Sequence, residues 1–578
     1  MISFRIWAPN AKQVQVKIGS ALFSMTTAEG GWWFTELPLD REEIDYAFVL
    51  DGGEPLPDPR SPWQPNGIHR ASRTVNHRAY SWNDQLWQAK PLSSAIFYEV
   101  HIGTFTPQGT FIAAIDQLDY LVDLGVTHLE LMPVAEFSGN RGWGYDGVDL
   151  YAPHHAYGEP DDLKRLVDAC HARGLAVVLD VVYNHLGPTG NYLARFGLYF
   201  THRYTTPWGQ AVNFDGPDSD EVRRFFCDNA LMWFRDYHFD GLRIDAVHAI
   251  LDTSAMHFLE QLACEVKDLQ AQTGRYLTLI AESDSNDPRI IRPQESGGYG
   301  VQAQWSDDFH HALHSVLTGE RTGYYVDFGS LADLAKAFRR AFVYDGRYST
   351  FRRRRHGRPT NGLSGHSFLG YLQTHDQIGN RAKGERSSHL MSVGRLKIAA
   401  ALILTGPFLP MLFQGEEWGA TSPFLYFTDH TDPELARNVT EGRRREFASF
   451  GWNPEEIPDP QAVDTFECSK LNWRERYEEP HAGLLAWHCR LIKLRREIPA
   501  LSDGCLDRVY ASFDETAKWL VVRRGPVVVV CNLSQATQRV TPGINAATGL
   551  LLASEDTVRF SQNAVELPSD SVAILSTE

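Results

Sequence analysis

Eight short apolar segments alternate with helical patterns through the middle of the chain, and this alternation restricts the fold more than any other feature. Each segment has the length of a strand. Most of the intervening segments place apolar residues at three- and four-residue spacing, as 160–174 and 219–239 do. Strands that alternate with helices form a parallel sheet, and eight is the number that closes a (β/α)8 barrel, or TIM barrel. The predicted strands lie within 94–105, 127–134, 175–185, 239–247, 277–283, 301–306, 367–376 and 407–417.

The segments on either side of the predicted barrel have a β pattern. Residues 1–90 contain short alternating runs divided by Gly, Pro and Asp, and similar runs return after a helical stretch at 484–497. A chain of 578 residues is also too long for one ordinary core. We therefore predict three domains: an N-terminal β-sandwich at 1–90, the barrel with insertions at 91–500, and a C-terminal antiparallel β-sheet domain at 501–578.

Charge and cysteine content argue against several classes of partner. The formal net charge is −17, which disfavours binding to nucleic acid or to an anionic membrane. The basic run 351–358 is the local exception, and a run this short is typical of a solvated loop. No apolar segment reaches the roughly 20 residues of a membrane span. Seven widely spaced cysteines, and a start without the pattern of a secretory signal, predict a cytoplasmic protein with free thiols.

The carboxyl ends of the predicted strands carry a distinctive group of polar side chains. Barrel enzymes build their active sites at this end of the barrel. A single strand-end carboxylate more often caps a helix or pairs with a basic neighbour, but that explanation does not account for several acids, histidines and an arginine on one rim. The group comprises Asp180, Asn184, His185, Arg243, Asp245, His248, Glu282, His375 and Asp376.

Arg243 and Asp245 stand two positions apart on the fourth predicted strand, so their side chains share one face. Burial of such an ion pair is expensive and is rarely favoured for stability alone. A functional reason for the pair is that Arg243 keeps Asp245 ionised and oriented in a poorly solvated pocket.

Two reaction classes suit this rim: metal-assisted hydrolysis, and glycoside hydrolysis by a pair of carboxyl groups. The sequence lacks the HxH and HExxH spacings of tight metal sites, and a guanidinium beside the central carboxylate competes with a cation. Trp143 and Tyr145 follow the second predicted strand, and their rings can stack on the faces of sugars. We therefore favour carbohydrate as the substrate, and we expect neither a metal nor a cofactor.

Four segments resemble, in order and spacing, the signature regions of the α-amylase superfamily of glycoside hydrolases. These segments are 180–185, 241–248, 281–284 and 373–380.

The resemblance implies a role for each residue of the rim. Asp245 would be the nucleophile, Glu282 the general acid and base, and Asp376 the stabiliser that binds hydroxyls of the reacting sugar. A retaining mechanism needs a carboxylate about 5–5.5 Å from a carboxyl group that starts protonated. Asp245 should stay charged beside its arginine, whereas Glu282, near other acids, should have a raised pKa. The resemblance also implies sugar contacts for Tyr145, His185, Arg243 and His375, and we expect Trp143 and His248 to contact the substrate as well.

Further segments resemble the maltooligosyltrehalose trehalohydrolase family within that superfamily, and they extend over almost the whole chain. This resemblance implies hydrolysis of the α-1,4 bond next to the terminal trehalose of maltooligosyltrehalose, with release of trehalose and a maltooligosaccharide. It also implies an immunoglobulin-like, carbohydrate-binding type of N-terminal sandwich and a functional coupling to a maltooligosyltrehalose synthase. Thr374 departs from the asparagine that is usual in the family. The segments are 56–69, 97–111, 305–325, 375–386 and 442–452.

A polar cluster after the sixth predicted strand is suited to binding neutral sugars through their hydroxyl groups. The acidic residues of this cluster could instead occupy the N-terminus of a helix, where negative charge is favourable. We expect part of the substrate cleft at Asp307, Asp308, Phe309, His310 and His311, together with Gln377 and Asn380.

Two alternative functions remain open from the sequence. A glycogen branching enzyme shares the N-terminal sandwich but would transfer the glycan to another chain instead of to water. A non-catalytic glucan-binding relative would be expected to lack at least one of Asp245, Glu282 and Asp376, and the sequence contains all three.

Overall fold

The computed structural model describes the chain except residues 42, 449–452, 544–548, 562–563 and 578. Part of the segment 442–452 therefore lies outside the described residues.

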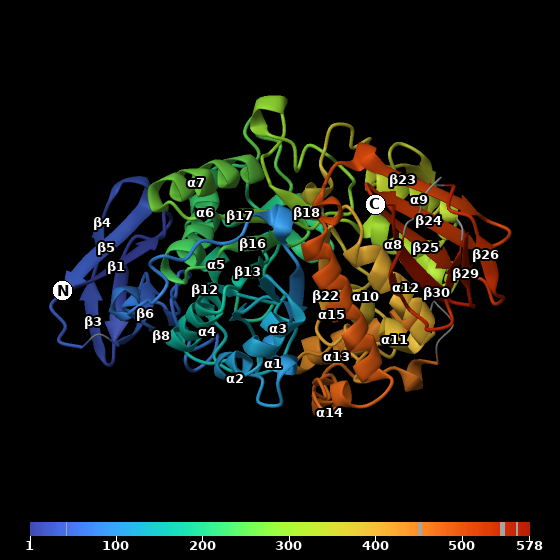
Figure 1. The fold of residues 1–578 in the computed structure, drawn as a ribbon. Coiled ribbons are helices and arrows are strands. Elements are labelled where there is room, and N and C mark those ends of the chain that lie inside the picture. Colours follow the sequence, from blue (N-terminus) through green and yellow to red (C-terminus); the bar gives the residue numbers. More distant parts are fainter. Residues whose placement is uncertain (42, 449–452, 544–548, 562–563, 578) are drawn as a thin grey trace.

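Eight parallel strands close into the predicted TIM barrel (Figure 1). The barrel closes where the last strand pairs with the first, with Met411 opposite Phe97. All eight predicted strands are confirmed, and each lies inside its predicted segment. Around the barrel the strands are β9 (Phe97–Val100), β10 (His128–Leu131), β13 (Ala176–Val181), β16 (Gly241–Ile244), β17 (Thr278–Ala281), β18 (Ala303–Trp305), β21 (Phe368–Gly370) and β22 (Leu409–Phe413).

The interior of the barrel is apolar at its base and polar at its mouth. Val178 and Ile280 belong to a buried apolar cluster. Side chains along a strand alternate between its two faces. Asp180 and Glu282, two positions after Val178 and Ile280, therefore lie on the same face as these apolar residues. The strand-end acids therefore lie above a dry, packed floor.

Helices surround the barrel, and the longer ones among them, such as α4, bury an apolar stripe. In α4 the side chains of Leu163, Leu166, Val167 and Cys170 are buried, which is the three- and four-residue spacing of a helix face. The helices are α1 (Ile102–Phe105), α2 (Phe111–Ile115), α3 (Leu118–Leu124), α4 (Pro160–Ala172), α5 (Leu193–Phe196), α6 (Ser219–Asp236), α7 (Phe258–Thr273), α8 (Asp307–Thr318), α9 (Leu331–Arg340), α10 (His375–Gly379), α11 (Ser387–Leu390), α12 (Val393–Leu404), α13 (Pro433–Ala448), α14 (Val463–Glu467) and α15 (His481–Glu497).

Short antiparallel hairpins interrupt the alternation of strand and helix. The first follows β10, the second follows β13, and the third lies between β18 and β21. The hairpins are β11 (Ala135–Glu136) with β12 (Asp149–Pro153), β14 (Phe200–Thr206) with β15 (Gly209–Val212), and β19 (Tyr348–Ser349) with β20 (Arg354–Arg355).

Antiparallel sheets stand at both ends of the chain, as predicted, and Figure 1 shows them on opposite sides of the barrel. In the N-terminal pair of sheets the rings of Phe4 and Tyr46 meet edge to face at 4.9 Å between centroids. The N-terminal strands are β1 (Ile2–Trp7), β2 (Val14–Ile18), β3 (Ala21–Ser24), β4 (Thr26–Thr27), β5 (Trp32–Leu37), β6 (Asp45–Leu50), β7 (Pro55–Leu56) and β8 (Ser72–Arg73). The C-terminal strands are β23 (Val509–Asp514), β24 (Trp519–Arg524), β25 (Val527–Asn532), β26 (Gln538–Val540), β27 (Gly549–Ala553), β28 (Arg559–Ser561), β29 (Ala564–Leu567) and β30 (Ser571–Ser576).

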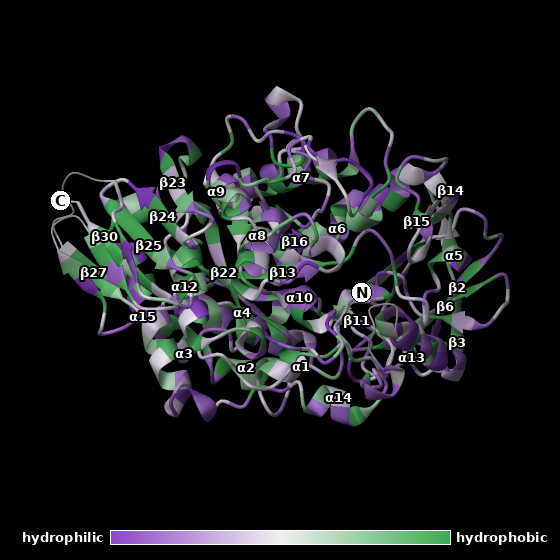
Figure 2. Cartoon of the chain, turned by 90° about the vertical axis from the view of Figure 1, so that its right-hand side faces the viewer, coloured by the Kyte–Doolittle hydropathy of each residue, from purple (hydrophilic) through white to green (hydrophobic). Residues whose placement is uncertain are grey.

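The distribution of hydropathy follows this architecture. Figure 2 shows hydrophobic residues concentrated in the C-terminal sheet, among them β25 and β30, and hydrophilic residues along α13. Among the described residues, no helix combines the length and the apolar character that a bilayer crossing requires. The domain boundaries at 90/91 and 500/501 remain predictions.

Candidate active site

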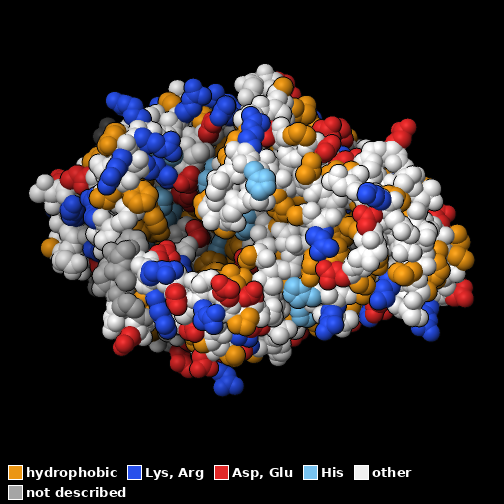
Figure 3. All heavy atoms as spheres, turned by 180° about the vertical axis from the view of Figure 1, so that it is seen from behind, with side chains coloured by type: hydrophobic (Ala, Val, Ile, Leu, Met, Phe, Trp, Pro, Cys, Tyr) orange, Lys and Arg blue, Asp and Glu red, His pale blue; other side chains and the backbone are white. Residues whose placement is uncertain are grey.

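A pocket of about 480 Å³ opens at the mouth of the barrel. The molecule is hollowed on the face opposite to that of Figure 1, and acidic and histidine side chains gather inside the hollow (Figure 3). The structure brings ten of the predicted site residues together in the lining of this pocket. They are Trp143, Tyr145, His185, Arg243, Asp245, His248, Glu282, His375, Asp376 and Asn380.

Arg243 forms the electrostatic centre of the site. Its side chain is 2% exposed, and Nη1 donates to both carboxylate oxygens of Asp180, at 3.0 and 2.9 Å, and to Oδ1 of Asp245 at 2.8 Å. Asn184 Nδ2 donates to the other oxygen of Asp245 at 2.9 Å. Burial alone would raise the pKa of Asp245, but the charge of Arg243 and these hydrogen bonds outweigh it, so the pKa is lowered. Asp245 is therefore ionised.

A tight turn after β16 connects Asp245 to Glu282. Ala246 adopts a left-handed conformation, with φ of 40°, which is unusual for a residue with a side chain. The turn directs the backbone N–H of Ala246 at Oε2 of Glu282, 2.6 Å away. The strain thus lies between the two carboxyl groups that the reaction would need, a place where proteins often retain it.

Glu282 has surroundings opposite to those of Asp245. Arg243 comes no closer than 4.0 Å between Nη2 and Oε2. Burial raises the pKa of Glu282 to about 8, and the negative charges of Asp245 and Asp376 act in the same direction. Glu282 therefore holds a proton at neutral pH and can donate it.

Asp376 lies at the start of α10, and the cap of that helix fixes its position. Thr374 Oγ1 accepts from the backbone N–H of Asp376 at 3.2 Å, and Gln377 Oε1 accepts from the backbone N–H of Thr374 at 2.8 Å. The threonine that departs from the family pattern is thus the N-cap of α10, and Gln377 completes the capping box rather than lining the pocket. Asn380 Nδ2 donates to Oδ1 of Asp376 at 2.5 Å.

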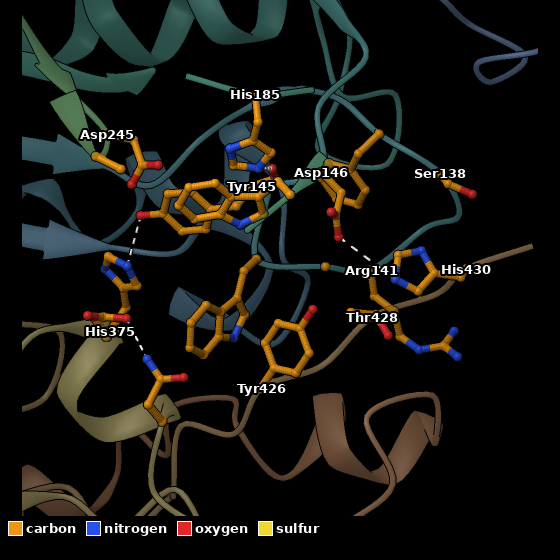
Figure 4. Close-up of a pocket in the computed structure, with 18 of the residues that line it drawn as sticks. Ser138, Arg141, Tyr145, Asp146, His185, Asp245, His375, Tyr426, Thr428 and His430 are labelled. Atoms are coloured by element: carbon orange, nitrogen blue, oxygen red, sulfur yellow. Dashed lines mark hydrogen bonds and ion pairs between the residues drawn. The ribbon is translucent and has the colours of Figure 1, made fainter. Parts of the chain in front are cut away.

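Two aromatic side chains from inserted loops form walls of the pocket. Tyr145, on the loop between β11 and β12, places its hydroxyl 2.6 Å from Asp180 Oδ2. The same hydroxyl lies 2.9 Å from His375 Nε2 (Figure 4). The ring of His185 stacks on Trp208 at 4.6 Å between centroids, with planes 5° apart. Trp208 lies between β14 and β15 and is 47% exposed, so its ring is accessible to a sugar bound in the pocket.

The cluster after β18 is divided between packing and the neighbourhood of the site. Asp308 is buried, and its Oδ2 accepts from Asn286 Nδ2 at 2.8 Å and from the backbone N–H groups of Val343 and Tyr344 at 2.7 Å. Phe309 is fully buried and meets the rings of Phe338 and Phe408. These contacts place both side chains inside the helix layer and outside the pocket lining. The predicted position of acidic residues at a helix N-terminus agrees with the first turn of α8.

The other three members of the cluster also lie outside the pocket lining. The buried His310 contacts Tyr325 through Nε2 at 2.9 Å, and the ring of His311 lies 4.8 Å from that of Tyr324. Asp307 accepts from the hydroxyl of Tyr371 at 2.5 Å. Burial raises the pKa of Asp307 to about 8, and the charge of Glu282 contributes, so Asp307 lies within electrostatic range of the proposed acid.

Residues of the outer rim were not predicted from the sequence. Arg141 pairs with Asp429 at 3.0 Å, and Arg443 on α13 donates through Nη1 to Asn380 Oδ1 at 3.1 Å. None of the rim residues stands directly at the end of a predicted strand, although Arg141 and Asp146 share the loop after the second predicted strand with Trp143 and Tyr145. The rim residues that line the pocket are Phe137, Ser138, Arg141, Asp146, Tyr426, Thr428, Asp429, His430 and Arg443.

One group of potential metal ligands occurs among the described residues, and it lies outside the pocket lining. Glu136, His154 and His155 have their ligand atoms within 4.8 Å of one another. The carboxylate of Glu136 already contacts Nδ1 of His154 at 3.2 Å and Nδ1 of His155 at 2.7 Å. Hydrogen bonds across the β11–β12 hairpin account for this group without an ion.

Comparisons with known proteins agree with the geometry. Residues 76–202 match the family model of the alpha amylase catalytic domain. The malto-oligosyltrehalose trehalohydrolase of Rhizobium sp. (strain M-11) is 49% identical over 99% of this chain and 97% of that protein. The protein of the same name from Mycobacterium tuberculosis (strain H37Rv) is 48% identical over 100% and 99%. Among solved structures, a Salmonella typhimurium protein provisionally described as an alpha amylase is 38% identical, with a TM-score of 0.90 over 99% of this chain and 97% of that one.

Proposed function

The chain belongs to the malto-oligosyltrehalose trehalohydrolase family, and from this we propose that it hydrolyses the α-1,4-glucosidic bond next to the terminal trehalose of maltooligosyltrehalose. The products would be trehalose and a maltooligosaccharide. The observation that carries the proposal is identity of almost half the residues over the full length of the relatives, because that span includes the barrel, its inserted loops and both flanking β regions.

The proposed chemistry is a retaining double displacement. The carboxylate of Asp245 attacks the anomeric carbon and Glu282 gives its proton to the glycosidic oxygen, so that the C–O bond breaks and trehalose leaves. Glu282, now ionised, then takes a proton from water. The resulting hydroxide attacks the glycosyl–Asp245 ester and regenerates both groups. The low pKa of Asp245 and the pKa of about 8 of Glu282 support these roles.

The remaining pocket residues would bind the sugar. We assign Asp376 to hydroxyl groups of the reacting glucose, because its carboxylate lies in the pocket and is oriented by Asn380. Tyr145 and Trp208 supply ring faces for stacking. His311 and Asp307 remain candidates for recognition of the trehalose unit, since both follow β18 and both side chains are only partly buried.

The proposal extends to the surroundings of the enzyme. A maltooligosyltrehalose synthase would supply the substrate, because the terminal trehalose must first be made on the end of a maltooligosaccharide. We also propose a cytoplasmic location, which the seven free cysteines support.

Product analysis tests the proposed reaction. Maltotriosyltrehalose and maltopentaose are incubated separately with the protein, and we expect release of trehalose from the first at a much higher kcat/KM than any hydrolysis of the second. Equal rates on both substrates, or α-1,6 branches formed on amylose, would contradict the proposal, and the latter would instead support a branching enzyme.

A further inference from the structure

A chain of hydrogen bonds beneath the pocket is not used in the mechanism above. It begins at Glu99 on β9, whose Oε1 lies 2.5 Å from Nδ1 of His375 and whose Oε2 accepts from the backbone N–H of His375 at 3.1 Å. It continues from Nε2 of His375 to the hydroxyl of Tyr145 at 2.9 Å (Figure 4). That hydroxyl in turn donates to Oδ2 of Asp180 at 2.6 Å. Glu99 and His375 are buried, at 1% and 3% exposed.

Asp180, at one end of this series of hydrogen bonds, determines where the protons of Tyr145 and His375 lie. Both oxygens of Asp180 accept from Arg243, which identifies the group as an ionised acceptor. The contact with Tyr145 therefore uses the single proton of the phenol. The phenol oxygen then has only lone pairs left for His375, so Nε2 of His375 must carry a hydrogen.

The Glu99 end of the chain gives the same result for the other ring nitrogen. With Glu99 ionised, its carboxylate can only accept hydrogen bonds, and Oε2 already accepts from the backbone of His375. Nδ1 of His375 must therefore carry a hydrogen as well. An imidazole ring with hydrogen on both nitrogens is a cation.

We propose that Glu99 is a positioning residue that holds His375 as an imidazolium, so that Nε2 of His375 is a permanent hydrogen-bond donor at the floor of the pocket. The proposal concerns the protonation of a side chain and does not depend on which glucan is cleaved. It assigns a role to a residue of the first barrel strand that does not line the pocket itself.

The charged groups around His375 agree with this assignment. Burial and the positive charge of Arg243 would lower its pKa, whereas the charge and hydrogen bond of Glu99 and the charge of Asp376 raise it, and the net shift of the pKa is upward. His101, which follows β9 and lies within electrostatic range of His375, adds no charge because burial lowers its pKa to about 3.

The charge has a consequence for recognition. A neutral imidazole could present either a hydrogen or a lone pair to a sugar hydroxyl, whereas an imidazolium presents only a hydrogen. His375 lines the pocket, and both of its hydrogens are donated within the protein, to Glu99 and to Tyr145, so it presents a positive charge and no lone pair to a sugar beside it. The ion pair with Glu99 also keeps the net charge of the floor low beside a reaction centre that becomes positive.

Nitrogen-15 NMR of histidine-labelled protein tests the protonation state directly. His375→Asn identifies the signal of His375, and in the wild type at pH 7.5 we expect both ring nitrogens to be protonated. Glu99→Gln keeps the shape and removes the charge, and we expect it to give a neutral ring at the same pH. A neutral His375 in the wild type overturns the proposal, even if no variant can be purified. An imidazolium that persists in Glu99→Gln overturns the role of Glu99.

Glu130→Gln is the matched control for this substitution. Glu130 is the register partner of Glu99 on β10 and is equally buried, but neither of its oxygens has a hydrogen-bond partner. Burial raises its pKa well above the usual range, so it is uncharged and a glutamine resembles it closely. The His375 signal should stay that of an imidazolium in this variant. A neutral His375 in Glu130→Gln would show that any change in the floor of the pocket suffices to deprotonate the ring, and would overturn the specific role of Glu99.

Kinetics give a readout that a purely structural role would not change. In Glu99→Gln the pKa of His375 should fall towards the ordinary histidine value of about 6.5 or below it. The kcat/KM of the variant, relative to that of the wild type, should therefore recover as the pH is lowered from 8 towards 6. A loss that is uniform across this range would show that Glu99 only supports the fold. Because the NMR measurement needs no substrate, failure of the proposed hydrolysis would not be confused with failure of this inference.

Discussion

Two carboxyl groups at the ends of neighbouring strands are held in opposite protonation states by what surrounds each of them. Asp245 has a guanidinium at 2.8 Å and an amide donor at 2.9 Å. Glu282 has one backbone N–H, a guanidinium no closer than 4.0 Å, and two other acids nearby. The same residue class thus supplies a charged group for the proposed nucleophile and a neutral group for the proposed acid within one pocket.

Removal of either carboxyl group should abolish most of the activity. We expect Asp245→Asn and Glu282→Gln each to lower kcat by several orders of magnitude, because one loses the attacking charge and the other the proton that is transferred. Rates on maltotriosyltrehalose and the thermal midpoint are measured together, and the midpoint should change little. Near-normal turnover in either variant would show that the roles are wrongly assigned.

The pH dependence of kcat/KM should report both groups. Glu282 must be protonated to act, so activity should fall as the pH rises through about 8. Asp245 must be ionised, and its pKa lies below the usual value of about 4, so the acid limb should appear only below about pH 4. The profile is measured from pH 3.5 to 10, and apparent values belong to the coupled groups together. A basic limb centred near pH 5 would be incompatible with Glu282 as the acid.

The positions of the proposed catalytic residues could be predicted from the sequence because each follows an apolar strand directly. Asp245 and Glu282 come one residue after β16 and β17, so the pattern of the strand fixes where they lie. Trp208 and Arg443 could not be predicted in this way, because they reach the pocket from an inserted hairpin and from α13. Their positions depend on how these insertions fold back over the barrel, which no local pattern records.

At the scale of elements, α8 shows how a polar motif can serve packing and the site at once. The helix begins at Asp307, and its first turn places adjacent side chains in different surroundings. Asp307 lies near the acids of the pocket, whereas Asp308 binds the backbone of Val343 and Tyr344. Sequence reasoning treated the whole motif as part of the cleft because residue type alone does not tell which face of a helix points inward.

This division predicts different outcomes for two neighbouring truncations. Asp308→Ala leaves three buried donors without a partner, and each such group costs about 1–3 kcal/mol, so the thermal midpoint should fall clearly. The ratio of kcat/KM for maltotriosyltrehalose and maltopentaose should stay as in the wild type. His311→Ala should instead lower this ratio, since a missing polar partner penalises the substrate that needs it.

Asp308→Asn serves as the control, because its side-chain oxygen can still accept hydrogen bonds. We expect its thermal midpoint to lie between those of the wild type and Asp308→Ala. A ratio that falls in Asp308→Ala, with an unchanged midpoint, would place Asp308 in the recognition of trehalose after all.

The barrel was predictable at this scale because eight apolar runs of strand length alternate with helices, and the structure confirms each of them. The short hairpins were not predicted as elements. The strands β19 and β20 comprise only two residues each, and β14 is exposed or half-buried at all but its last residue, so these strands lack the buried apolar run that marks a barrel strand.

For the whole molecule, we expect activity to be independent of divalent cations. The proposed chemistry needs two carboxyl groups and no Lewis acid. Exhaustive treatment with EDTA followed by dialysis should leave kcat and the thermal midpoint unchanged. Loss of activity that returns with Ca²⁺ would contradict this expectation. A lower thermal midpoint with unchanged activity would instead indicate a structural ion, for which Glu136, His154 and His155 are the candidate ligands.

Because β22 pairs with β9, the barrel cannot close until β22 has been synthesised. The two strands are separated by about 310 residues, and a ribosome adding roughly 5–20 residues per second needs about 15–60 s to pass from one to the other. During that interval β9 has a free edge of unpaired backbone groups, which is the feature through which unfinished sheets associate wrongly. The N-terminal sandwich, complete in the first ninety residues, can fold long before the barrel closes. The period of greatest exposure to aggregation therefore ends only when Leu409–Phe413 has left the ribosome.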